Sequence, residues 1–166
     1  MEKKKYPIPR VEGPNIEYAH LLEQDYVGPV SEETAIHLYL YQHMINEKMF
    51  PEFSDLLHHI MIDEMIHLEL LGETILLLGG DPKYRTIEST TGIPQYWKAN
   101  HVNYATGLKE MLAADIESEE IAIRNYEAHR EMIQDRYIKE LLTAIIENEK
   151  EHLHIFQTFF QNYILR

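Results

Sequence analysis

The chain has 166 residues, of which 45% are hydrophobic and 26% are charged, so its length and apolar content predict one folded domain and exclude a disordered chain. Its net charge of −13 argues against nucleic acid and membrane surfaces as partners, because both are negatively charged. The absence of cysteine excludes disulfides, iron–sulfur clusters and a cysteine nucleophile, whereas ten histidines and 28 acidic residues suit metals that bind nitrogen and oxygen ligands.

We expect neither a signal peptide nor a membrane-spanning helix in this sequence. Residues 1–10 are basic, but no apolar stretch follows them, and a signal peptide requires one. The longest apolar runs, such as residues 75–78, are far too short to cross a bilayer. These features predict a cytoplasmic protein.

The first thirty residues differ in pattern from the rest of the chain. Residues 1–30 hold four of the seven prolines and predict an extended N-terminal arm with one short helix at about residues 15–24. From residue 31 to residue 166 the pattern becomes helical. Ser31 is a suitable N-cap, and the two glutamates that follow it favour the positive end of a helix.

Four long helices are predicted in residues 31–166. The first follows Ser31, and the second runs from Pro51 to about residue 78, where a Gly-Gly-Asp-Pro sequence stops it. Residues 81–105 have no clear period and no convincing strand, so they predict a long loop. The third helix is expected at about 106–132 and the fourth from a turn near residue 134 to about residue 163. This pattern predicts an all-α fold, a four-helix bundle with one long crossover between helices two and three. The aromatic residues Tyr84, Tyr96, Trp97 and Tyr104 are expected to hold this crossover against the bundle or a second subunit.

An internal repeat joins the two halves of the predicted bundle. Residues 32–39 and 119–126 are identical at five of eight positions, at an offset of 87. The segment Glu64–His67 matches Glu149–His152 as Glu-x-x-His, at an offset of 85. Each half therefore contains one helix with a glutamate followed by a helix with Glu-x-x-His.

This repeat predicts a dinuclear metal site. Glutamate and histidine three residues apart project from one face of a helix, and antiparallel pairing brings the glutamate of the preceding helix to the same level. Four carboxylates and two imidazoles would then meet in the core, at a high cost unless cations neutralise them. Two divalent ions would do so. One Glu-x-x-His alone would more simply be an exposed ion pair, but two in matching halves favour the metal site over a metal-free bundle.

The register of two helices stays open at this point. On the third helix, Glu117, Glu119 and Glu120 lie within one turn. The repeat favours Glu119, and a different register with Glu117 or Glu120 as the ligand stays open. On the fourth helix, Glu151 and His154 are an alternative to Glu149 and His152.

The motifs resemble those of the ferritin-like superfamily, and within it bacterioferritin and rubrerythrin. Ser-Glu-Glu-Thr-Ala-Ile at residues 31–36 and Asp-Glu-Met-Ile-His at 63–67 resemble its first two helical motifs, and the likeness extends over about residues 31–156. The resemblance implies that Glu64 and Glu149 bridge two metals and that Glu32 and Glu119 are terminal ligands. The complete implied ligand set is Glu32, Glu64, His67, Glu119, Glu149 and His152.

Differences between this sequence and those two families determine the electron donor, oligomeric state and cofactor that we expect. Rubrerythrin carries an additional cysteine-ligated iron, which this chain cannot bind, so an external electron donor is expected. Bacterioferritin continues into a fifth helix that helps to build its 24-subunit shell, whereas fourteen residues follow His152 here. We therefore expect a homodimer. Met65 lies near the position of the haem-ligating methionine of bacterioferritin, but we interpret it as a packing residue and do not expect haem.

Two tyrosines and two aspartates are further candidates. Tyr39 and Tyr126 lie about two turns after Glu32 and Glu119, where each either hydrogen-bonds a ligand carboxylate or relays an electron, or is an ordinary core tyrosine. We treat both as candidate catalytic residues. Asp63 and Asp115 are expected either to orient a histidine or to be exposed or capping.

The function that these features predict is redox chemistry at two metals. We expect two iron ions and a peroxidase or ferroxidase activity in oxidative-stress or iron handling, with hydrogen peroxide or O2 as the substrate. Because glutamate and histidine also bind manganese, a di-manganese catalase is the alternative. A non-enzymatic iron-binding or structural bundle is the contrasting class.

Overall fold

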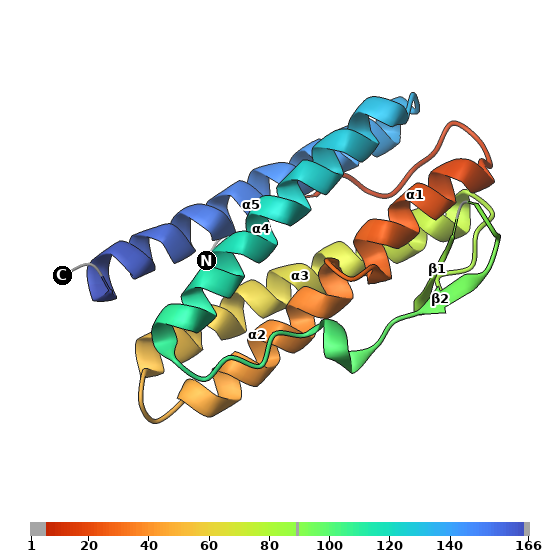
Figure 1. Cartoon of the computed structure of the whole chain (residues 1–166). Helices are drawn as coiled ribbons and strands as arrows, with labels where there is room; N and C mark the ends of the chain where they lie inside the picture. The colour runs from red at the N-terminus through yellow and green to blue at the C-terminus, as the bar shows by residue number, and fades with distance from the viewer. Residues whose placement is uncertain (1–5, 89, 165–166) are drawn as a thin grey trace.

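The computed structural model of the chain describes residues 6–88 and 90–164. Four helices form a bundle, and a shorter helix precedes them (Figure 1). Within the bundle, α2 pairs with α3 and α4 pairs with α5. The prediction of an all-α four-helix bundle is confirmed. The helices are α1 (Ile16–Val27), α2 (Glu32–Asn46), α3 (Pro51–Leu77), α4 (Leu108–Met132) and α5 (Arg136–Tyr163).

The ends of α2 and α3 follow the signals in the sequence. Ser31 caps α2, since its Oγ accepts a hydrogen bond from the backbone N–H of Thr34 at 3.3 Å, and α3 begins at Pro51. Gly79 ends α3 with a φ of 85°, a backbone conformation that side chains with a Cβ rarely adopt. The cap places Glu32 at the first position of α2.

The crossover contains a small sheet that the sequence pattern did not predict. Strands β1 (Arg85–Ile87) and β2 (Pro94–Tyr96) pair antiparallel, with Thr86 opposite Gln95. A 3₁₀ turn at Ala99–His101 follows, and the chain then runs beside α2 to the start of α4 (Figure 1). The prediction of no strand was wrong here. Strands of three residues are too short to show an alternating pattern, and the proline in β2 argued against one.

Aromatic residues hold the crossover against the bundle. The indole Nε1 of Trp97 donates a hydrogen bond to Thr34 Oγ1 at 2.9 Å. The ring of Tyr84 stacks on that of Tyr26, with 5.9 Å between the centroids. Tyr96, by contrast, is 59% exposed. The expected attachment of the crossover to the bundle is therefore made by particular aromatic residues.

Two apolar clusters divide the interior, and a polar layer lies between them. Along α3, Phe53 and Leu57 belong to one cluster, whereas Leu71 and Ile75 belong to the other. Leu22 of α1 joins the second cluster, so the helix of the N-terminal arm packs into the core. The segment of α3 between the clusters carries the Glu-x-x-His motif. In the described part of the chain, no helix is both long and apolar enough to span a membrane.

Candidate metal centre

The polar layer contains the six predicted ligands, one or two from each bundle helix. Glu32 comes from α2, Glu64 and His67 from α3, Glu119 from α4, and Glu149 and His152 from α5. None of the six is more than 4% exposed. They form two overlapping groups, in each of which the candidate ligand atoms lie within 4.8 Å of one another. We call these groups the His67 position (Glu32, Glu64, His67 and Glu149) and the His152 position (Glu64, Glu119, Glu149 and His152).

Two carboxylates belong to both positions. His67 Nδ1 lies 2.9 Å from Glu64 Oε2 and 2.9 Å from Glu149 Oε1. His152 Nδ1 lies 3.1 Å from Glu64 Oε1 and 3.1 Å from Glu149 Oε2. Each of these glutamates therefore turns one oxygen toward one histidine and the other oxygen toward the second histidine. This is the arrangement that a bridging carboxylate requires.

The candidate residues of the two open registers differ in burial. On α4, Glu119 is buried, whereas Glu117 and Glu120 are exposed. On α5, Glu151 and His154 are exposed and do not belong to either position. The residues that the internal repeat favours as ligands are therefore the buried ones.

Burial and crowding perturb the ionisation of the grouped side chains. Burial, with repulsion from the Glu149 carboxylate, raises the pKa of Glu32 and of Glu119 well above the ordinary value. Burial opposes protonation of His67 and His152, but the surrounding carboxylates outweigh it and raise the pKa of both imidazoles. Burial also opposes ionisation of Glu149, but the two histidines hold its pKa below the ordinary range. Without metal, the site thus retains protons.

The donor set fits divalent cations. Glu64 Oε1 is buried and, among the residues that the structure describes, makes no hydrogen bond, although His152 Nδ1 lies 3.1 Å away without the alignment of one. An unpartnered buried carboxylate oxygen is costly. Two cations would bind such oxygens and replace the retained protons, and carboxylates with imidazoles suit iron and manganese.

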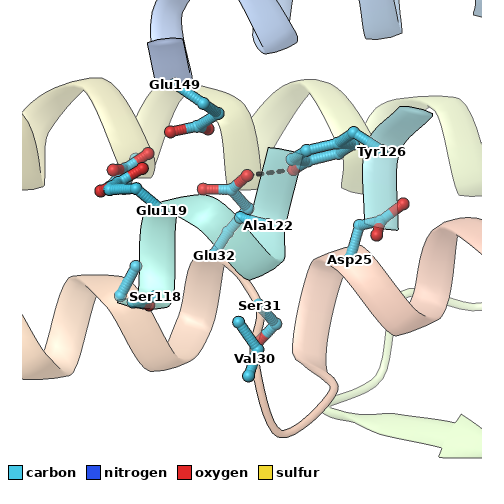
Figure 2. Close-up of a pocket in the computed structure, with 11 residues that line it drawn as sticks. Asp25, Val30, Ser31, Glu32, Ser118, Glu119, Ala122, Tyr126 and Glu149 are labelled. Atoms are coloured by element: carbon cyan, nitrogen blue, oxygen red, sulfur yellow. Dashed lines mark hydrogen bonds between the residues drawn. The ribbon is translucent and has the colours of Figure 1, made fainter. Parts of the chain in front are cut away.

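Each tyrosine of the repeat hydrogen-bonds a glutamate of the other half. The Tyr39 hydroxyl donates to Glu119 Oε1. The Tyr126 hydroxyl donates to Glu32 Oε1, as the dashed line in Figure 2 shows. Burial and the neighbouring carboxylates raise the pKa of both phenols well above its ordinary value, so both stay protonated donors. The two tyrosines thus fix one oxygen of each glutamate that belongs to a single position.

The outer nitrogen of His67 contacts two residues that were not among the predicted site residues. His67 Nε2 lies 2.8 Å from the Tyr6 hydroxyl and 3.2 Å from Asn148 Oδ1. Asn148 could have been found, because the offset of 85 places it opposite Asp63. Tyr6 lies outside the repeat, and only the folded path of the N-terminal arm brings it here.

The two candidate aspartates have different roles. Asp63 Oδ2 lies 3.4 Å from His152 Nε2, as expected for a residue that orients a histidine. Asp115 is fully buried and accepts a hydrogen bond from Gln42 Nε2 at 2.8 Å. Both expectations for Asp115, an exposed or capping residue or a partner of histidine, are therefore wrong.

A narrow cavity reaches the carboxylates from the α1–α2 turn (Figure 2). Its volume of about 10 Å³ is at the lower limit for one water molecule. Besides the glutamates, it is lined mainly by small side chains, together with Tyr126 and with Asp25, which is paired with His129 at 2.7 Å. A larger hollow of about 1070 Å³ lies between α1 and the small sheet and includes none of the six grouped residues. The narrow cavity is lined, apart from the glutamates, by Asp25, Val30, Ser31, Ala35, Ser118, Ala122 and Tyr126.

Comparison with known proteins gives relatives over most of the chain. The family model of the ferritin-like domain matches residues 30–164. A probable manganese catalase of Clostridium acetobutylicum is 26% identical, over 89% of this chain and 72% of that protein. The fold is similar to that of KatB, a manganese catalase from Anabaena, with a TM-score of 0.79 and 22% identity over 98% of this chain and 80% of that one. The bacterioferritin BfrA of Mycobacterium tuberculosis gives a TM-score of 0.74 and 25% identity over 90% of this chain and 87% of that one.

Proposed function

Because the chain belongs to the ferritin-like domain family, as its motifs predicted, we propose that the six grouped side chains bind two divalent metal ions and that the protein is an oxidoreductase acting on hydrogen peroxide or O2. The observation that carries this proposal is the sharing of Glu64 and Glu149 between the two positions. Two shared carboxylates would hold two ions as a pair, as in the carboxylate-bridged proteins built on this type of bundle.

The proposed ligands divide into two bridging and four terminal groups. Glu64 and Glu149 would bridge, because each has an oxygen at both positions. Glu32 and Glu119 would each bind one ion. The hydroxyls of Tyr126 and Tyr39 would orient these two carboxylates by donating a hydrogen bond to one oxygen of each. His67 and His152 would bind through Nδ1, the nitrogen that faces the carboxylates.

A di-iron peroxidase or ferroxidase is the activity that we propose first. When bound, the metal pair supplies two electrons to an O–O bond without releasing a radical. The chain itself excludes bulk water, since its ligands are buried, and the narrow cavity beside them favours a substrate the size of peroxide over a large organic one. Because the sequence contains no cysteine, a peroxidase cycle requires an electron donor from outside the chain.

Manganese catalase activity is the second candidate. It is supported by the likeness to the probable manganese catalase of C. acetobutylicum, and the carboxylate-rich donor set accepts manganese as well as iron. A catalase would need no external donor, because peroxide would both oxidise and reduce the metal pair. The presence or absence of a donor requirement therefore separates the two candidates.

The proposal is tested by elemental analysis of protein purified without chelators, with peroxide consumption measured on the same sample. About two iron ions per chain, the number that the bridged site requires, and peroxide consumption that depends on an added reductant would support the first candidate. Manganese at the same stoichiometry, with release of O2 in the absence of a reductant, would support the second. If neither metal binds after anaerobic addition of Fe(II) or Mn(II), the protein is a structural bundle and the proposal is wrong.

Replacing Tyr39 with phenylalanine should lower the free energy of unfolding of the metal-loaded protein without unfolding it. The variant leaves Glu119 Oε1 without its buried donor, and a hydrogen bond to a charged group contributes about 1.5–3 kcal/mol. We expect a loss of that size in the free energy of unfolding, measured by denaturation in saturating Mn(II). Tyr41→Phe is the control on the same helix, since its ring packs edge-on against Tyr104 in the crossover and it is not one of the side chains that contact the six ligands in the described part of the chain. Equal effects of the two substitutions would contradict the assigned role of Tyr39.

A further inference from the structure

The internal repeat is broken at one pair of residues beside the proposed bridging glutamates. Asp63 precedes Glu64, and Asn148 precedes Glu149, so the offset of 85 makes Asp63 and Asn148 equivalent. In the structure each faces the histidine of the other half. Asp63 Oδ2 lies 3.4 Å from His152 Nε2, whereas Asn148 Oδ1 lies 3.2 Å from His67 Nε2. One histidine therefore faces a carboxylate and the other an amide.

The N-terminal arm reinforces this difference. The Tyr6 hydroxyl lies 2.8 Å from His67 Nε2 and donates a hydrogen bond to Asn148 Oδ1, so His67 faces two neutral oxygens. Asn148 Nδ2 also lies 2.9 Å from His152 Nε2. Asn148 thus turns its acceptor oxygen toward His67 and its amide nitrogen, which can only donate, toward His152, so it does not accept a hydrogen bond from His152. Asp63 is then the acceptor that remains for His152.

The contacts at the Nε2 atoms of His67 and His152 affect how strongly each histidine binds a metal. An imidazole that binds a metal through Nδ1 carries its proton on Nε2, and the group that accepts this proton orients the ring and sets its strength as a ligand. A carboxylate acceptor makes the imidazole more electron-rich than a neutral oxygen does. His152, with Asp63, is on this basis the stronger ligand, and His67, with Asn148 and Tyr6, is the weaker one.

We propose that the replacement of one aspartate of this pair by asparagine makes the two metal positions unequal, so that the His152 position binds its ion first and more tightly and the His67 position holds the more weakly bound ion. The inference rests on the proposed metal centre but not on the reaction that the centre performs. Asp63, Asn148 and Tyr6 would act as positioning residues, because they contact the histidines and not the metals.

The test is to locate the first metal ion. Metal-free protein receives one equivalent of Co(II), and anomalous diffraction from its crystals shows which position is occupied. We expect the ion at the His152 position. The double variant Asp63→Asn with Asn148→Asp keeps the total charge and exchanges the two acceptors, and in it the first ion should move to the His67 position.

Calorimetric titration with Co(II) measures the size of the effect. Loss of an outer partner of a metal-binding histidine reduces affinity by about 10- to 100-fold, so Asp63→Asn should weaken the first binding step by that factor. Tyr6→Phe, on the N-terminal arm, should weaken only the second step. Circular dichroism of each variant verifies its fold, and Tyr6→Phe keeps the test available if a buried substitution disrupts folding.

The outcomes separate this inference from the proposed function. Equal occupancy of the two positions by the first ion, or its binding at the His67 position in the natural protein, would overturn the inference while leaving the dinuclear site intact. The same holds if the exchanged variant still fills the His152 position first. If the natural protein binds no Co(II) at all, the proposed metal centre itself is wrong, and the inference is wrong with it.

Discussion

Replacement of Glu64 by alanine should prevent the chain from holding a pair of metal ions. Glu64 has one oxygen at each position, 2.9 Å from His67 Nδ1 and 3.1 Å from His152 Nδ1, so the substitution removes a ligand from both ions at once. Loss of a residue that only orients a ligand already costs about 10- to 100-fold in metal affinity, and loss of a shared ligand should cost more. We expect fewer than two ions per chain after equilibration with Mn(II), together with loss of peroxide consumption.

The equivalent substitution in the other half, Glu149→Ala, should have the same effect, because Glu149 also has an oxygen at each position. Glu117→Ala is the matched control, since Glu117 is an exposed glutamate on α4 two residues from Glu119. It should bind two ions as the natural protein does. Loss of one ion from this control would show that the α4 ligand has been assigned to the wrong residue, and normal binding by Glu64→Ala would disprove the bridging role.

The sequence predicted those parts of the centre that a repeat can encode. Four bundle helices followed from caps, proline and glycine signals, and the repeat selected Glu119 over its exposed neighbours because it fixed equivalent positions in the two halves. Burial of Glu149 and His152 but not of Glu151 and His154 agrees with the offset of 85 between the Glu-x-x-His segments and not with the offset of 87 that relates Glu32 to Glu119. Two related helix pairs impose one geometry twice, so an error of register in either half would have disagreed with the other.

The features that the sequence did not predict come from contacts between distant segments. Tyr6 reaches His67 from 61 residues away, and nothing in the composition of a proline-rich arm indicates where its side chains will lie. Asp115 is buried beside Gln42 because two helices from different halves meet there, not because of any local pattern. The short strands in the crossover likewise depend on pairing with each other. Local periodicity carries no information on such pairings.

Metal should reverse the dependence of stability on pH. In the metal-free protein, the pKa values of Glu32 and Glu119 lie above the ordinary value of 4.5, and those of His67 and His152 lie above 6.5. The folded state therefore binds more protons than the unfolded state once the pH exceeds those ordinary values. Stability then falls as pH rises, by about 1.4 kcal/mol per pH unit for each additional proton held. Glu149 has the opposite sign, since its pKa is lowered, but its contribution changes only below about pH 4.5 and is constant in this window.

Bound metal reverses the slope of stability against pH, because metal binding requires deprotonated carboxylates and imidazoles. The affinity for metal consequently rises with pH. We expect the melting temperature to fall between pH 5 and pH 8 in EDTA, and the stabilisation by Mn(II) to grow over the same interval. The pair of Asp25 and His129, whose pKa values are also raised, lies outside the six ligands and should affect the melting temperatures in EDTA and in Mn(II) alike.

Glu119→Gln isolates the contribution of one ligand carboxylate, because a neutral amide at this buried position cannot gain or lose the proton. Its melting temperature in EDTA should fall less steeply with pH than that of the natural protein, and Mn(II) should stabilise it less. A melting temperature in EDTA that rises steadily from pH 5 to pH 8 would show that the grouped carboxylates do not retain protons in the metal-free fold.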